Sequence, residues 1–205
     1  MNVGDKKTVS AEWLLANADA VKIVDASWAM RANRKEEYGK RRIAGALFFC
    51  IDECSDHSVA LPHQMPSEEV FNAYCQRLGL CKNDAIVLYD VGDAFMSARV
   101  WFMLSAFGHT NVAILDGGLS AWAAAGGALH DDTAPLPQPA QGDFCGTLDT
   151  ARLKSMADVK EIVATKSAFV RLRERIRLPR LSAHSIYSQN SSCAFIVYLF
   201  FSSFF

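Results

Sequence analysis

The chain has 205 residues, of which 51% are apolar, and its formal net charge is −1 at pH 7. A chain of this length and composition can bury a full hydrophobic core, with room for one domain or for one domain and part of another. The near-neutral charge gives no overall electrostatic reason to expect nucleic acid or an anionic membrane as the main partner, so small molecules and proteins remain.

Short apolar segments alternate with amphipathic ones from Ser10 onward, and Ser10 and Ser67 are well placed to cap helices. Strand-like segments 86–89 and 112–115 are apolar throughout and have a helix between them, which is typical of a parallel sheet covered by helices on both faces. The predicted fold class is therefore α/β. The pattern predicts helices over residues 11–18, 34–42, 68–78, about 94–107 and 119–125, and strands over residues 21–27, 43–49, 85–89 and 112–115.

Two carboxylates follow predicted strands, Asp25 in "VDAS" and Asp90 in "LYDVGDAF". The carboxyl ends of parallel strands are the usual ligand edge of such sheets. The segment after Asp90 is a short loop leading into a helix, a geometry that lets backbone amides hold an anion beside a nucleophile. A carboxylate is a poor nucleophile and would repel that anion. Asp25 is most simply a structural acceptor for loop amides.

Composition changes twice in the second half of the chain. Residues 129–147 contain three prolines among polar residues, which predicts an extended linker rather than packed structure after a domain at 8–128. Residues 148–170 repeat the opening order of helix then strand, as if a second copy began. Residues 171–205 start with "RLRERIRLPR", and the change at Arg171 predicts a foreign or disordered tail, of the kind that a shifted reading frame produces. The final apolar run is shorter than the roughly 20 residues of a membrane span.

Five segments in this order and spacing resemble the first domain of two-domain rhodanese-type sulfurtransferases, and in particular the 3-mercaptopyruvate sulfurtransferase group. The segments are "VDASW", "RRIAGALFFCIDECSD", "LPHQMPS", "VLYDVGDAFMSARVWFMLSAFGH" and "ILDGGLSAW". The resemblance covers about residues 8–170 and implies a rhodanese-like domain followed by an incomplete second copy.

In that family the second domain carries a cysteine that accepts sulfur as a persulfide and passes it to a thiol or to cyanide. The resemblance places Asp90 at the nucleophile position of the inactive first-domain loop, and it places Asp52 and His63 near the shared active cleft as possible members of a proton relay. Cys193 lies in "NSSCAFIV", without a following glycine or helix signal, so it does not match the family nucleophile. The implied activity is sulfur transfer from mercaptopyruvate or thiosulfate, with a small-molecule donor, a thiol acceptor and no cofactor, and this chain is expected to be inactive alone.

Two other classes of function are a noncatalytic binding module and a zinc-dependent structural protein. A rhodanese-like domain without its cysteine could be a noncatalytic binding module. Cys50, Cys54, His57 and His63 form a C-x3-C-x2-H-x5-H pattern, but the interval between the cysteines differs from that of usual zinc modules, so no metal site is predicted. The start of the chain has no signal-peptide or transit-peptide pattern, and the scattered cysteines suit reduced thiols, so the expected location is the cytoplasm.

Overall fold

The computed structural model describes residues 1–165 except 59, 93 and 132. Its contacts divide the chain into two compact units, one of residues Met1–Leu148 and one that begins at Asp149. The two units are described separately.

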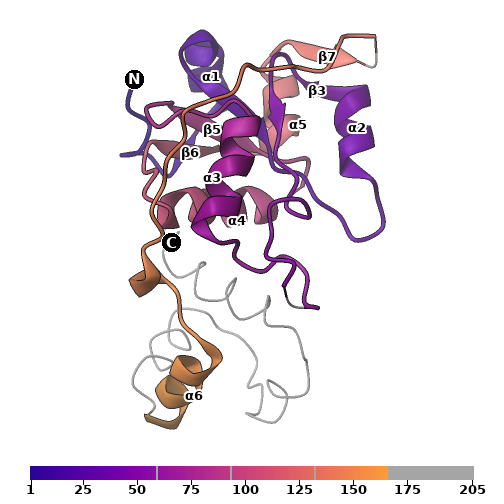
Figure 1. Ribbon diagram of the computed structural model, residues 1–205. Coiled ribbons are helices and arrows are strands. Elements are labelled where there is room, and N and C mark those ends of the chain that lie inside the picture. The colour runs from indigo at the N-terminus through magenta and orange to yellow at the C-terminus, as the bar shows by residue number, and fades with distance from the viewer. Residues whose placement is uncertain (59, 93, 132, 166–205) are drawn as a thin grey trace, which may run out of the picture. The chain divides into compact units, whose positions relative to one another are not determined.

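The first unit is built on a five-stranded parallel sheet with the order β1-β6-β5-β2-β4, which confirms the predicted α/β class (Figure 1). Strands β5 and β6 are buried along their whole length, as expected for a sheet covered on both faces. The strands are β1 (Thr8–Val9), β2 (Lys22–Asp25), β4 (Leu47–Phe48), β5 (Ile86–Tyr89) and β6 (Val112–Leu115).

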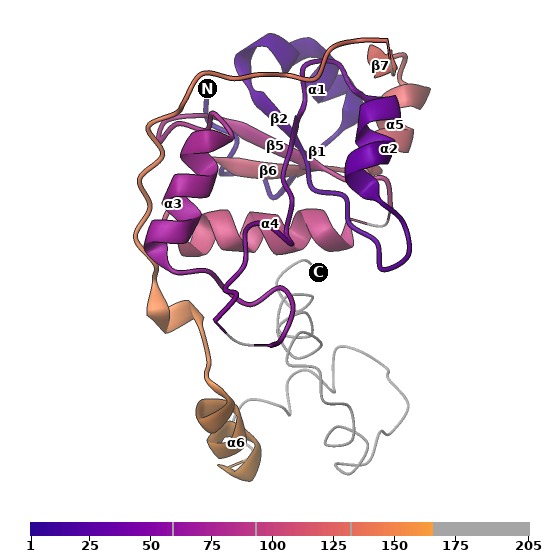
Figure 2. The ribbon, with the colours of Figure 1, turned by 45° about the vertical axis from the view of Figure 1, so that its right-hand side comes forward.

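Helices cover both faces of this sheet (Figure 2). Helices α1 (Ala11–Asn17) and α5 (Gly118–Ala124) lie on one face, and α3 (Glu68–Arg77) and α4 (Phe95–Ala106) lie on the other. Helix α2 (Arg34–Lys40) lies beside the end of the sheet near α5. The hydroxyl oxygens of Ser10 and Ser67 accept the amides of Trp13 and Val70, so both predicted caps are confirmed. A short 3-10 helix (Ala18–Ala20) follows α1.

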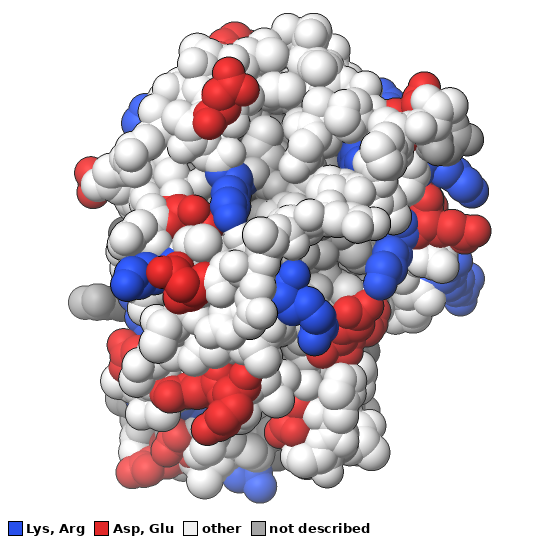
Figure 3. Space-filling model, turned by 45° about the horizontal axis from the view of Figure 1, so that its top comes forward, with Lys and Arg blue, Asp and Glu red and all other residues white. Residues whose placement is uncertain are grey.

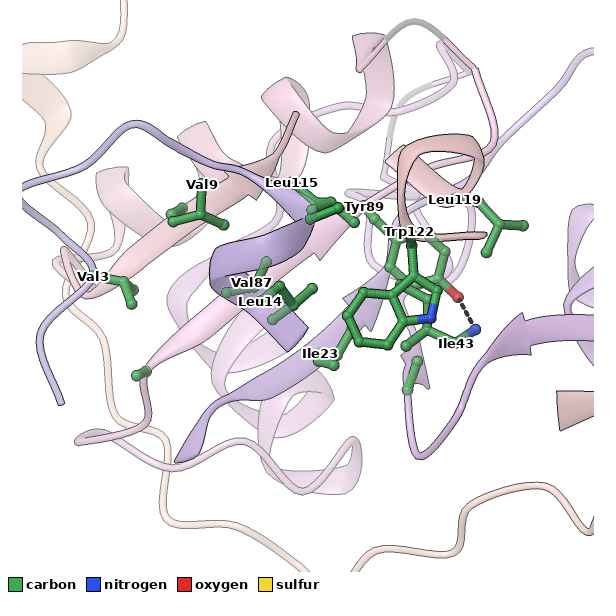
Figure 4. Packing of buried hydrophobic residues seen from close by; sticks show 14 of the residues in the cluster. Val3, Val9, Leu14, Ile23, Ile43, Val87, Tyr89, Leu115, Leu119 and Trp122 are labelled. Carbon is green, nitrogen blue, oxygen red and sulfur yellow. Dashed lines mark hydrogen bonds between the residues drawn. The ribbon is translucent and has the colours of Figure 1, made fainter. Parts of the chain in front are cut away.

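The core on the α1 and α5 face is shown in Figure 4. Leu14 of α1 and Trp122 of α5 pack there with Val87 and Tyr89 of β5, and all four side chains are almost fully buried. The Tyr89 hydroxyl accepts the amide of Ile43 at 3.2 Å. Alternate residues of β5 face the opposite layer, so this strand holds both layers of the core together.

The segment predicted as the end of one helix and one continuous strand, residues 41–49, is divided differently. Strand β3 (Arg41–Ile43) ends before Gly45, whose φ of +75° turns the chain toward β4. Strand β3 pairs antiparallel with β7 (Leu129–Asp131). Arg42, predicted at the end of the helix over residues 34–42, is fully buried, because its guanidinium donates to the carbonyl oxygens of Ala134 and Pro135 at 2.9 and 2.8 Å.

The segment predicted as a linker, residues 129–147, packs against the domain at both ends. Its start forms β7, and its end runs along α3. The Asn72 side chain donates to the carbonyl oxygen of Gly146 and accepts its amide. The Gln76 side chain, one helical turn later, donates to the carbonyl oxygen of Phe144. Phe144 is 1% exposed. The prolines favour an extended backbone. Hydrogen bonds to β3 and α3 make this backbone part of the first unit.

In the second unit, the described residues form a 3-10 helix (Thr150–Arg152) and α6 (Met156–Thr165). The helix agrees with the helical start of the predicted second copy. The strand expected after it, and the predicted tail 171–205, lie outside the described residues. No helix among residues 1–165, the undescribed positions aside, is long and apolar enough to cross a membrane.

Candidate functional site

The loop after β5 is closed around the side chain of its first residue. Asp90 is 4% exposed, and one of its carboxylate oxygens accepts the amides of Gly92 and Ala94 at 3.0 and 3.1 Å. The other oxygen accepts the amide and the hydroxyl of Ser97 at 3.0 and 2.9 Å. The amides that could have held a ligand anion therefore already bind an anion that belongs to the protein. Position 93 of this loop is not described.

The loop after the neighbouring strand β2 is tied to the Asp90 loop. The carboxylate of Asp25 accepts the amide of Ser27 at 2.8 Å, and the Ser27 hydroxyl oxygen accepts the amide of Val91 at 3.1 Å. Burial raises the pKa of Asp25, and the hydrogen bonds from Ser27 and Tyr89 oppose that effect. The prediction that Asp25 is a structural acceptor for loop amides is confirmed.

Asp52 and His63, the two residues that the resemblance singles out, are in contact. The imidazole Nε2 of His63 lies 2.8 Å from one carboxylate oxygen of Asp52, and the indole nitrogen of Trp28 donates to the other at 3.1 Å. The Trp28 and His63 rings meet edge to face, with centroids 4.7 Å apart. The Asp52 side chain is 61% exposed, whereas that of His63 is 16% exposed. The carboxylate of the pair thus faces solvent, and the imidazole is largely covered.

Two residues of this cluster were missed from the sequence. Trp28 directly follows "VDAS", so its place beyond a strand end was the available signal. Arg99 lies on α4 and donates to the carbonyl oxygen of His63 at 3.0 Å. His63 has a φ of +56°, a left-handed conformation that few residues other than glycine adopt, and the bond from Arg99 helps to fix it. No sequence pattern gives this contact.

Three of the described cysteines, Cys50, Cys54 and Cys75, do not resemble activated thiols. Burial raises the pKa of Cys54 to about 12, and it also raises the pKa of Cys50 and Cys75. Cys193 lies outside the described residues. Among residues 1–165 without the three undescribed positions, no group of three or more His, Cys, Asp or Glu side chains is arranged to hold a metal ion. Cys54 is buried and His57 is exposed, so the C-x3-C-x2-H-x5-H pattern is not brought together.

The charges on the surface are mixed. On the face drawn in Figure 3, Lys and Arg side chains are interspersed with Asp and Glu side chains. That face does not form the single-sign basic surface that nucleic-acid binding requires.

The class of this domain follows from its fold and its loop. The fold is a parallel sheet with helices on both faces, and the loop of backbone amides joins a strand to a helix. A family model described as rhodanese-like domain matches residues 10–125. The chain belongs to the rhodanese-like domain family.

The relatives are sulfurtransferases. Thiosulfate/3-mercaptopyruvate sulfurtransferase 1, mitochondrial, of Arabidopsis thaliana is 46% identical over 123 residues, which are 58% of this chain and 32% of that protein. Human 3-mercaptopyruvate sulfurtransferase is 37% identical over 164 residues, which are 75% of this chain and 54% of that protein. The crystal structure of SseA from Escherichia coli, a 3-mercaptopyruvate sulfotransferase, superimposes with a TM-score of 0.74 at 31% identity and covers 79% of this chain and 63% of that one. The chain thus spans between about a third and somewhat more than half of these curated relatives.

Proposed function

We propose that residues 1–148 act as the noncatalytic first domain of a sulfurtransferase that uses mercaptopyruvate or thiosulfate, and that this chain alone does not transfer sulfur. The observation that carries the proposal is the carboxylate of Asp90 in the anion-binding loop. Sulfur transfer through a persulfide needs a thiolate that attacks the donor sulfur, and the loop amides would have to stabilise that thiolate. Here the amides are engaged by a carboxylate of the chain itself.

The raised pKa values of Cys50, Cys54 and Cys75 support the same proposal, because a thiol that stays protonated at neutral pH is a weak nucleophile. The contact between Asp52 and His63 supports an auxiliary role in the complete enzyme. The exposed carboxylate orients the imidazole, which can then accept or release a proton for a reacting group that another domain supplies. The donor in that enzyme is a small molecule and the acceptor is a thiol.

The test is an assay of the full 205-residue chain with mercaptopyruvate and with thiosulfate, with dithiothreitol or cyanide as the acceptor. We expect no pyruvate and no thiocyanate above a protein-free blank, whereas human 3-mercaptopyruvate sulfurtransferase in the same assay serves as the active control. Intact-mass measurement after incubation with the donor should show no added sulfur atom. Repeated turnover, together with a cyanide-labile sulfur on one defined cysteine, would overturn the proposal.

A further inference from the structure

A cavity of about 350 Å³ opens at the carboxyl ends of β2 and β5, and Asp90, Asp52 and His63 are not among its lining residues. Its floor includes Asp25 and Ser27, which end and follow β2, and Val91, which follows Asp90. In the strand order β1-β6-β5-β2-β4, the chain leaves β2 toward β4 on one side and leaves β5 toward β6 on the other. The cavity therefore lies at the topological switch point of the sheet, where α/β proteins bind their ligands.

The floor of this cavity is fixed by contacts already described. The amide of Val91 donates to the Ser27 hydroxyl oxygen, and the Asp25 carboxylate accepts the amide of Ser27. These bonds tie the two strand-end loops together without closing the space above them. Asp25 is 1% exposed and is held by its neighbours, so it does not present a free carboxylate to the cavity.

The rim carries an excess of positive charge. Arg34, Lys40 and Arg41 line the cavity from α2 and the start of β3. Arg34 is paired with Glu37, which also lines the cavity. Lys40 and Arg41 are exposed, and none of the ion pairs between described residues involves either of them. Two cations are thus available to an anionic ligand at one rim.

The remaining walls are apolar with a few hydroxyl groups. Tyr38, Val91 and Leu119 contribute apolar surface, and the hydroxyl groups of Ser27 and Ser120 lie among them. The Tyr38 hydroxyl donates to the carbonyl oxygen of Ala46, so this hydroxyl is already used within the chain. The volume is near the lower limit of pockets that hold drug-sized ligands, so a small organic molecule fits.

We propose that this cavity reversibly binds a small organic carboxylate, with the carboxylate group at Lys40 and Arg41 and a short apolar body against Tyr38, Val91 and Leu119. The binding is noncovalent and separate from the proposed sulfur transfer. It gives the noncatalytic domain a ligand site of its own, bordered by Val91 of the loop that Asp90 begins.

The test is an NMR titration of the full chain with sodium butyrate at constant ionic strength, with butyramide as the neutral analogue of the same shape. We expect saturable shifts of the amides of Ser27, Val91 and Leu119 with butyrate, and weaker binding of butyramide. Replacing both rim cations in Lys40→Gln/Arg41→Gln should weaken butyrate binding by about tenfold, because a charge-assisted hydrogen bond is lost. The matched control Arg77→Gln/Lys82→Gln removes the same charges far from the cavity and should leave binding unchanged.

A second variant tests position without changing charge. Ser120→Trp adds a large side chain to the cavity lining with both cations kept, and it should abolish the saturable shifts. Shifts that grow linearly with butyrate, equal weakening in the Arg77/Lys82 control, or full binding by Ser120→Trp would each overturn the proposal. Equal affinity for inorganic phosphate would overturn the carboxylate assignment, because the apolar walls would then contribute nothing. None of these results depends on whether the chain transfers sulfur.

Discussion

Asp90 follows β5 and Asp52 comes after β4, two strands that β2 separates in the sheet, and the two carboxylates lie in opposite environments. The Asp90 carboxylate is 4% exposed and receives four hydrogen bonds from its own loop and helix. The Asp52 side chain is 61% exposed, and its partners are the side chains of Trp28 and His63. A carboxylate whose partners are local backbone groups fixes the fold. A carboxylate that orients an imidazole at the surface is available for chemistry.

The largest expected effect comes from removing each carboxylate in turn. Asp90→Ala leaves buried amides of the loop and the Ser97 hydroxyl without an acceptor, and it should lower the free energy of unfolding by about 3 kcal/mol. Asp52→Ala removes an exposed interaction, and it should lower the same quantity by about 0.5 kcal/mol.

Urea denaturation followed by tryptophan fluorescence measures both variants within the first unit, because Trp13, Trp28, Trp101 and Trp122 all precede Leu148. Equal destabilisation by the two substitutions would remove the distinction between a structural and an available carboxylate.

Elements fixed by local residues could be predicted from the sequence, whereas elements fixed by distant partners could not. Strands β5 and β6 were predicted because their continuous apolar residues report burial on both faces. Strands β1 and β7 were not predicted, because segments of two or three residues form a strand only by pairing with distant partners. Strand β1 pairs with β6, and β7 pairs with β3. Arg42 was placed at the end of the predicted helix over residues 34–42. Its burial was not predicted, because a buried arginine without a carboxylate is unusual and the carbonyl oxygens that hold it come from residues about ninety positions later.

The candidate site shows the same limit. The carboxylate at position 90 could be placed after a strand and before a helix, but a loop sequence does not reveal that the side chain folds back onto its own amides. The proximity of Asp52 and His63 came from resemblance. The contributions of Trp28 and Arg99 depend on three segments that meet only in the folded chain.

Substitution of Asp25 gives a smaller effect on stability, and this effect depends on pH. The pKa of Asp25 is raised by burial, so the folded state holds this proton more tightly than the unfolded state. Its contribution to stability is therefore present below the ordinary pKa of about 3.8 and is lost as the pH rises through the raised value. We expect the free energy of unfolding of Asp25→Asn to rise relative to that of the unsubstituted chain as the pH increases over this range.

Asp143→Asn provides the control of opposite sign. The amide of Lys82 donates to Asp143 and holds the pKa of this exposed carboxylate below its usual value. Its stabilisation is present above pH 3.8 and is lost as the pH falls, so this variant should become less stable than the unsubstituted chain as the pH rises. Denaturant titrations at several pH values measure both differences, and slopes of the same sign would contradict the assignment for Asp25.

The smallest expected effect concerns Ala94, which the Asp90 carboxylate holds in a left-handed conformation with a φ of +65°. A side chain in this region costs about 1 kcal/mol, and glycine avoids that cost but loses more entropy on folding. Ala94→Gly should therefore raise the free energy of unfolding by about 0.5 kcal/mol, whereas the control Ala98→Gly, inside α4, should lower it by about 1 kcal/mol. If Asp90 imposes the conformation, the gain from Ala94→Gly should shrink in the Asp90→Ala background, where the loop can relax. An undiminished gain in that double variant would mean that the α4 entry, and not the carboxylate, sets the strained backbone.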